Sequence, residues 1–245
     1  MDAALAAAAT LVAVGFAFST LDRWSRGRRP HDLAWSVSLG LFALGAAALW
    51  WAETVGWSLA TFRLFYLAGA VLNVPWLALG TVYLLAGRRI GDAARWWLVL
   101  FSGLSAGIVL SAPTRVGVSG RELPTGKEVF GVAPRVLAAA GSGVAAIVII
   151  GGALWSVYRL ARRREPARAG VRRATSSPRR LVVGNLLIAT GTMVLSLSGT
   201  VAGRLGKDTA FASTLLIGIA VLFAGFLVAS TMRRQPLRAL HQRAA

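Results

Sequence analysis

Long apolar stretches separated by short polar connectors make up most of the chain. Seven can be marked, over residues 3–21, 33–52, 60–86, 96–112, 136–158, 181–203 and 209–232. A helix needs about 20 apolar residues to cross the ~30 Å hydrocarbon layer of a membrane. The pattern therefore predicts an all-α fold, a polytopic membrane bundle of seven transmembrane helices that forms a single domain over residues 1–245.

Basic residues are distributed unevenly between the two sides of this predicted bundle. Of 27 Lys+Arg, 20 follow the first, third, fifth and seventh stretches, and seven lie on the other side. Because cytoplasmic loops carry the excess of Lys and Arg, we expect the N-terminus outside and the C-terminus in the cytoplasm. Tryptophan supports these boundaries, since eight of nine lie near a predicted membrane edge and only Trp76 lies at mid-membrane.

Charge and composition then narrow the location and the partners. A formal net charge of +18 is compatible with nucleic-acid binding, but a basic rim on one face suits anionic lipid headgroups, so we predict no nucleic-acid partner. Arginine outnumbers lysine 25 to 2, and Ala, Gly and Val are abundant, as in high-GC bacteria. We expect a multi-pass protein of a bacterial plasma (inner) membrane. The chain has no cysteine, so thiol chemistry is excluded.

Ionisable residues in the hydrocarbon mark functional sites, and none lies near the centre of a predicted span. The nine acids, two histidines and two lysines fall in connectors or near span ends. This argues against haem ligation between helices, a retinal Schiff base, a buried proton relay, aspartyl hydrolysis and a zinc centre. We therefore predict no enzymatic activity, no catalytic residues, no cofactor and no metal.

Two predicted helices carry a stripe of small and neutral polar residues. In the third stretch the stripe contains Tyr66, Asn73 and Trp76. Pro75 removes a backbone hydrogen bond there, so we expect a kink and a free carbonyl at Val71, within reach of an Asn side chain or a water.

The sixth stretch carries a matching stripe of Asn185, Thr192 and Ser196. Such stripes serve either of two purposes. They pack helices closely, because small residues let backbones approach and Asn or Thr side chains bond across helices. Alternatively they line a cavity for a weakly polar ligand. In the second case the candidate ligand-binding residues are Tyr66, Asn73, Trp76, Asn185, Thr192 and Ser196.

The connectors add three further expectations. Glu53 and Arg63 flank the short outer hairpin and are close enough to form an interfacial ion pair. The outer loop over residues 113–135 either caps a cavity or is a solvated linker. The cytoplasmic loop over residues 159–180 carries nine arginines, which we expect to contact anionic lipid headgroups or, alternatively, to dock an acidic partner.

Residues 50–89 also resemble a known group. An R-x-[FY]-Y-L-x-G-A-x-L segment leads there to a G-T-x-Y-L-L ending, which resembles a set of uncharacterised actinobacterial seven-helix integral membrane proteins. More loosely, the outline is similar to the seven-helix sensor region of bacterial histidine kinases, which implies that signalling would need a separate partner. The resemblance implies no activity. The positions that carry it are Arg63, Tyr66, Gly69, Gly80, Thr81 and Tyr83.

Together these patterns predict a non-enzymatic integral membrane protein that binds a small apolar or weakly polar ligand, a lipid or a protein partner, in a sensory or accessory role. The alternative is a transporter or permease for a neutral solute, because the first three and last three spans enter the membrane in the same orientation. The small-residue faces suit a protein partner or homo-oligomer as well as internal packing.

Overall fold

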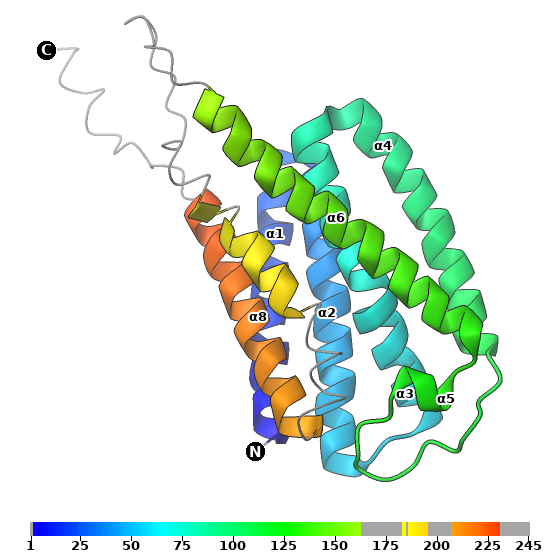
Figure 1. Cartoon of the computed structure of the whole chain (residues 1–245). Helices are drawn as coiled ribbons and strands as arrows, with labels where there is room; N and C mark the ends of the chain where they lie inside the picture. The colour runs from blue at the N-terminus through cyan, green and yellow to red at the C-terminus, as the bar shows by residue number, and fades with distance from the viewer. Residues whose placement is uncertain (1, 163–182, 185, 196–206, 231–245) are drawn as a thin grey trace, which may run out of the picture.

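A computed structural model describes residues 2–162, 183–184, 186–195 and 207–230. These residues are helical apart from their connectors and one isolated bridge between Thr114 and Phe130, which confirms the all-α prediction for this part of the chain. The elements, shown in Figure 1, are α1 Asp2–Gly27, α2 Pro30–Val55, α3 Leu59–Phe65, η1 Tyr66–Leu72, α4 Asn73–Ser111, α5 Gly126–Val129, α6 Val132–Arg162 and α8 Lys207–Ser230. A shorter apolar helix covers Leu186–Leu195.

Five helices of the described part are long and apolar enough to cross a membrane. One of them, Leu59–Ser111, has 53 residues. A straight helix of that length would measure about 80 Å, far more than a membrane needs. The helix is instead broken at Gly87, whose φ of 81° favours glycine, and the chain turns back there (Figure 1). Its two limbs correspond to the third and fourth predicted stretches.

The helices extend beyond the apolar stretches, and one stretch is largely undescribed. The limb after Gly87 is helical from residue 88, eight residues before its apolar stretch begins at residue 96, and Arg88 pairs with Asp92 one turn on. The sixth predicted stretch, 181–203, lies largely outside the described residues. The count of seven helices therefore stays a prediction.

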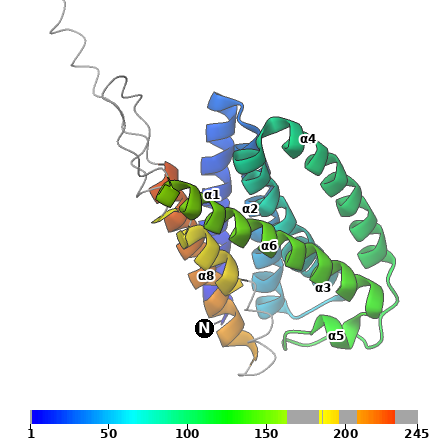
Figure 2. The same cartoon turned by 45° about the horizontal axis from the view of Figure 1, so that its top comes forward.

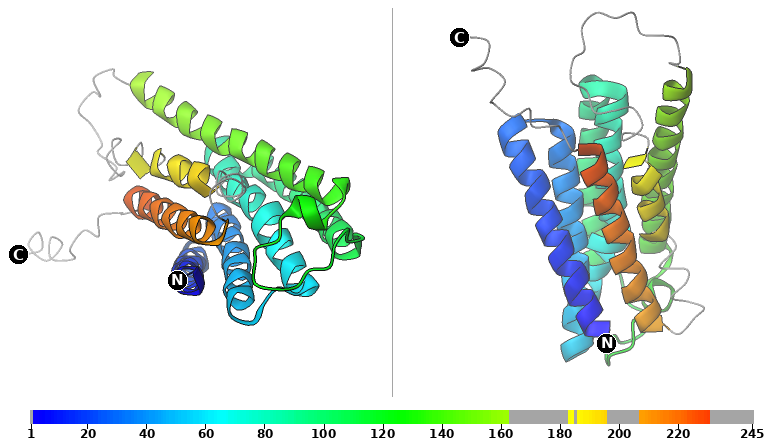
Figure 3. Two further views of the ribbon diagram at one scale, coloured as in Figure 1. Left: turned by 60° about the horizontal axis from the view of Figure 1, so that its bottom comes forward. Right: turned by 90° about the vertical axis from the view of Figure 1, so that its left-hand side faces the viewer.

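The basic connectors lie together at one end of the bundle. The end of α1, the start of α2, the bend at Gly87 and the ends of α6 and α8 share this end, and the N-terminus lies at the other (Figures 1 and 3). The alternation of helix direction thus agrees with the charge pattern, while orientation relative to a membrane stays a prediction. The described arginines at this end include Arg23, Arg26, Arg28, Arg29, Arg88, Arg89, Arg95, Arg159 and Arg162.

Helix α2 is central to the packing. It contacts α1 on one side and the first limb of α4 on the other, α6 packs against α4, and α8 packs against α1 (Figure 2). The α1 seam consists of Ala6, Ala9 and Ala13, which are fully buried. Their three- and four-residue spacing places them on one face, and their small side chains let α1 and α2 approach closely.

The loop between α4 and α6 packs over the end of the bundle opposite the basic end. The Trp57 backbone N–H donates to the carbonyl of Gly120 at 2.6 Å. Thr125 and Glu128 form a reciprocal capping box at the start of α5, and Phe130 is completely buried. Leu123, Val129 and Phe130 of this segment, which we name the capping loop, are buried against the bundle, while residues 113–117 and 119–122 are exposed.

Candidate ligand cavity

The backbone between α3 and α4 is not a regular α-helix. Tyr66–Leu72 form a π-helix, η1, which ends where the Asn73 N–H donates to the carbonyl of Ala68, five residues back. π-Helical turns are rare and occur frequently at functional sites. This π-helix ends three residues before Pro75, and within α4 the non-helical backbone is at Gly87.

The π-helix also changes which carbonyl lacks a donor. In the π register residue 75 would donate to residue 70, but Pro75 has no N–H. The hydroxyl of Ser142 on α6 supplies the missing donor and reaches the carbonyl of Ala70 at 2.9 Å. The acceptor satisfied by a side chain is therefore Ala70, one residue before the predicted Val71, and the donor is a serine of another helix.

Asn73 is buried at the junction of η1 and α4, with 7% of its surface exposed. The hydroxyl of Ser38 on α2 lies 2.9 Å from the Asn73 backbone carbonyl and 2.9 Å from its side-chain oxygen Oδ1, and both oxygens accept from it. This contact joins α2 to the start of α4 at mid-bundle. The predicted polar residue thus has a definite partner, although sequence reasoning did not single out Ser38.

A cavity of about 210 Å³ lies beside this junction. Residues of α2, η1, α4, α6, the Leu186–Leu195 helix and α8 line it. Asn73 and Ser142 are its only described side chains with polar atoms, and the rest of the wall is apolar. A Cβ added at Gly69 would meet no atom within 4 Å, so this glycine leaves part of the space open. The lining residues are Phe42, Gly45, Ala46, Phe65, Gly69, Ala70, Asn73, Val74, Ser142, Leu195, Phe211 and Leu215.

Aromatic side chains separate the cavity from the capping loop. The rings of Phe65 and Phe211, which line the cavity, lie 5.9 Å apart between centroids. Tyr66 packs edge-to-face on Phe130 of the loop at 5.1 Å, and its ring lies against Gly126 of α5. The structure therefore places Tyr66 in the cap and outside the lining of the cavity.

The other predicted ligand-binding residues lie elsewhere. The indole N–H of Trp76 donates to Ser102 on the second limb of α4 at 3.3 Å. Thr192 is buried and bonds to the carbonyl of Ile188 in its own helix at 2.8 Å. Thr192 and Asn73 both line a small gap of about 10 Å³, which has barely room for one water molecule. Packing is thus the better interpretation at this contact.

Asn185 and Ser196 lie outside the described residues. Of the four candidate residues that the structure describes, it brings only Asn73 to the larger cavity and joins Asn73 with Thr192 at the narrow gap.

Arg63 has a different partner from the one suggested by the sequence. Its guanidinium Nη2 donates to the carbonyl of Ala112 at 2.7 Å, at the end of α4. A cation at a helix C-terminus is favourable because it faces the negative end of the helix dipole. The ion pairs seen within the described ranges do not include Glu53 with Arg63.

Other positions of the resemblance also make contacts between segments. The indole of Trp35 on α2 lies directly over Gly80, where a Cβ would overlap it. Tyr83 packs over Gly91 across the bend, and its hydroxyl donates to Asp92 at 2.9 Å. These residues hold the backbone in place and do not line the cavity.

Sequence reasoning missed a buried ionic cluster at the basic end. The Asp32 side chain is 2% exposed and lies 3.4 Å from Arg23 of α1 and 3.8 Å from His31. The Arg23 guanidinium also lies over the ring of Phe226 on α8, 4.5 Å from its centroid. The available signal was two acids, Asp22 and Asp32, among four arginines in a short connector, with Asp32 two residues after Pro30.

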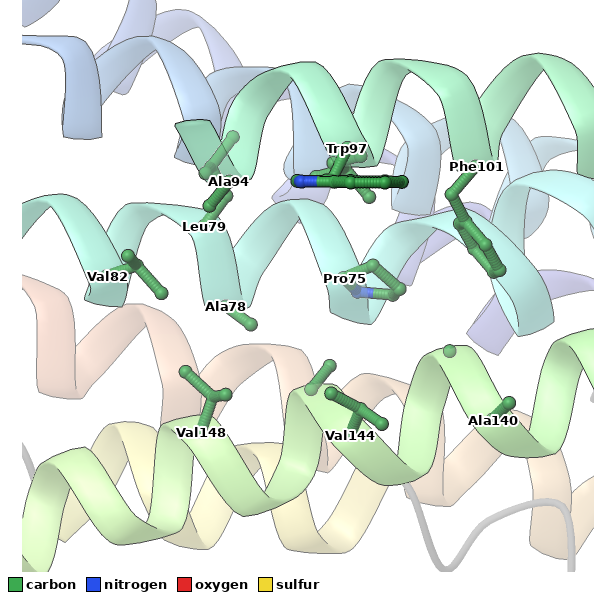
Figure 4. Close-up of a pocket in the computed structure, with 13 residues that line it drawn as sticks. Pro75, Ala78, Leu79, Val82, Ala94, Trp97, Phe101, Ala140, Val144 and Val148 are labelled. Carbon is green, nitrogen blue, oxygen red and sulfur yellow. The ribbon is translucent and has the colours of Figure 1, made fainter. Parts of the chain in front are cut away.

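A second hollow of about 390 Å³ opens between the two limbs of α4 and α6 (Figure 4). Its labelled wall includes Pro75, Trp97, Phe101, Val144 and Val148, and the remainder of its lining is equally apolar. In a membrane-embedded chain, lipid chains fill such an outward-facing groove. It therefore gives no indication of a specific ligand.

No protein-family model matches the chain, and neither the curated proteins nor the solved structures contain a match. Fold and cavity define the class of the protein: an all-helical protein with apolar helices of the length found in integral membrane proteins. Within the described ranges, no three His, Cys, Asp or Glu side chains gather to form a metal site.

Proposed function

We propose that this chain is a non-enzymatic, multi-pass protein of a bacterial plasma membrane that binds a small, apolar or weakly polar molecule in the cavity beside η1, in a sensory or accessory role. The observation that carries the proposal is the combination of a π-helix, a 210 Å³ cavity and a buried polar residue at one place. Irregular backbone at membrane depth is tolerated where it is buried or lines a cavity.

The size of the cavity limits the ligand. An apolar cavity of about 150 Å³ in another protein holds benzene, so about 210 Å³ suits a molecule of roughly six to ten non-hydrogen atoms. Its wall offers two neutral polar side chains and no ionised one among the described residues. A charged ligand would lose its hydration without a counter-charge, so the ligand is neutral.

The two ends of the helical bundle differ in a way that supports the same proposal. The capping loop closes the bundle at the end that the charge pattern places outside, with Phe130 buried beneath it. The arginines at the opposite end contact anionic lipid headgroups on the cytoplasmic side. A ligand would then reach the cavity from the membrane, where apolar molecules concentrate.

Native mass spectrometry of the protein released from its own membranes tests this function. We expect a stoichiometric bound mass of the order of 100 Da on the wild-type chain. Gly69→Leu should lose it, because the new side chain grows into open space in the cavity. Gly15→Leu is the matched control, since a Cβ at Gly15 also meets nothing within 4 Å but lies on the exposed face of α1.

Three outcomes would count against the proposal. A wild-type protein without any small bound mass would mean that the cavity is empty. The same mass on Gly69→Leu would place the ligand elsewhere. A protein that carries only another polypeptide would indicate an accessory subunit whose function depends on that partner.

A further inference from the structure

The groove between α6 and the two limbs of α4 reaches from the middle of the bundle toward its basic end. Pro75 and Phe101 lie at one end of its lining (Figure 4). Val82 and Ala94 lie at the other end. Val82 is five residues before the bend at Gly87 and Ala94 is seven after it, so this end lies about 8–10 Å from the bend at 1.5 Å per residue. The groove therefore joins the apolar middle of the bundle to its charged surface.

The size and the lining of this groove suit one acyl chain. A cavity of about 150 Å³ holds the six carbons of benzene, so about 390 Å³ has room for roughly 12–16 carbons. Among the described lining residues, the indole nitrogen of Trp97 is the one polar side-chain atom. In Figure 4 this nitrogen points toward Ala94 and away from Phe101, and thus toward the basic end. An indole oriented in this way suits the boundary between acyl chains and headgroups.

Three exposed arginines lie in the limb of α4 just after the bend, and their surroundings differ. Arg88 pairs with Asp92 at 3.7 Å. The Arg95 guanidinium lies over the ring of Trp96, 5.5 Å from its centroid. The ion pairs seen within the described ranges do not include Arg89. Arg89 therefore brings an uncompensated positive charge to the basic end of the groove.

Helix geometry places Arg89 in line with the groove wall. Residues four apart are neighbours on the surface of a helix. Arg89, Ala93, Trp97 and Phe101 follow this spacing, and the last two line the groove. The row thus runs from the charged end of the limb into the apolar lining. An acyl chain lying in the groove would bring its headgroup to the Arg89 end of this row.

We propose that this groove binds an anionic phospholipid of the cytoplasmic leaflet, with one acyl chain along the groove and its phosphate accepting hydrogen bonds from Arg89. Arginine suits phosphate because its planar guanidinium donates two parallel, charge-assisted hydrogen bonds. The apolar lining alone does not distinguish one acyl chain from another, so the headgroup supplies the selectivity. The inference uses the membrane location of the proposed function, but its site is separate from the cavity beside η1.

Native mass spectrometry of the protein in detergent micelles, titrated with phosphatidylglycerol or phosphatidylcholine of identical acyl chains, measures the first bound lipid. We expect the wild-type protein to bind phosphatidylglycerol about three- to tenfold more tightly, the effect of about one basic residue near an anionic headgroup. Arg89→Gln should reduce this preference to less than about twofold. Arg26→Gln is the matched control and should keep the preference, because it removes the same charge at the same end but lies on α1, which does not line the groove.

A second pair of variants tests the acyl-chain part of the site. Val144 lines the groove and is 63% exposed, whereas Ile147, about one turn on, is 73% exposed and does not line it. Val144→Trp should fill the groove and weaken binding of the first phosphatidylglycerol at least about tenfold. Ile147→Trp is the matched control and should leave that affinity unchanged, because its side chain lies outside the groove.

The outcomes separate this inference from the proposed function. Equal affinity for the two lipids, a preference that survives Arg89→Gln, or unchanged binding to Val144→Trp would each overturn the inference. A dimer that Val144→Trp converts to monomers without loss of lipid would also overturn it, because a second copy of the chain would then cover the groove. A wild-type protein with a small bound mass but no phospholipid would overturn this inference alone and leave the cavity proposal standing.

Discussion

Replacing Asp32 by asparagine is expected to destabilise the contact between α1, α2 and α8. The carboxylate is 2% exposed and its Oδ1 lies 3.4 Å from Nη2 of Arg23, which is 31% exposed. At an effective dielectric constant of ~20 the attraction at this distance is about 5 kcal/mol before desolvation. Breaking a fully buried pair costs about 3–5 kcal/mol and an exposed pair about 0–1. With one partner partly exposed, we expect about 1–3 kcal/mol.

The two single substitutions should differ. Asp32→Asn leaves an arginine that is partly exposed and can turn toward solvent or headgroups. Arg23→Met leaves a carboxylate that is almost fully buried, and His31 at 3.8 Å is then its remaining potential cation among the described residues. We therefore expect Arg23→Met to be the more destabilising change, since an uncompensated buried charge costs more than a partly solvated one.

The assay is equilibrium unfolding in mixed micelles at neutral pH, followed by tryptophan fluorescence, for both single variants and the double variant. The double-mutant cycle should give a coupling free energy of at least about 1 kcal/mol. Arg26→Met is the matched control: its partner Asp22 is 53% exposed, so the change should cost less than about 0.5 kcal/mol. Additivity of the two changes within about 0.5 kcal/mol would refute the reasoning.

Three further predictions concern packing, orientation and transport. Gly80→Ala should lower the free energy of unfolding by about 1–3 kcal/mol, because its Cβ overlaps the indole of Trp35; an unchanged midpoint would mean that the ring moves freely. In a chain without native cysteine, Ser119→Cys should react with a membrane-impermeant thiol reagent in intact cells and Ser25→Cys only after permeabilisation. The reverse pattern would invert the orientation. Glycerol flux into proteoliposomes should match protein-free vesicles, whereas protein-dependent flux would favour the permease alternative.

The local pattern of apolar residues in the sequence was sufficient to predict the long apolar helices of the described part. Helix formation and membrane compatibility depend on the length and hydropathy of continuous stretches, and five such helices are present in the described part. Successive helices run in opposite directions, with a break at Gly87, and the described arginine-rich connectors therefore lie at one end of the bundle, as the charge pattern predicts. The apolar stretch does not mark the start of a helix, as the limb after Gly87 shows, because a polar helix end can continue beyond the apolar stretch.

The sequence identified Asn73 as a polar residue of interest, but only the tertiary structure decided what surrounds it. Its partner Ser38 is 35 positions away and its neighbour in the cavity, Ser142, lies on α6. The same stripe contained Tyr66 and Trp76, which the structure assigns to the cap and to the second limb of α4. Residues on one face of a helix meet different neighbours along its length, and periodicity does not reveal which.

Hydropathy and charge by themselves determined that this protein is a set of apolar helices with a basic end, because those properties act through local chain length and solvent preference. The π-helix, the cavity beside it and the burial of Asp32 were decided by tertiary packing. They arise where distant helices supply or withhold a hydrogen-bond partner, as Ser142 does for the carbonyl of Ala70, and such pairing depends on the approach of α6 to η1 in the folded bundle.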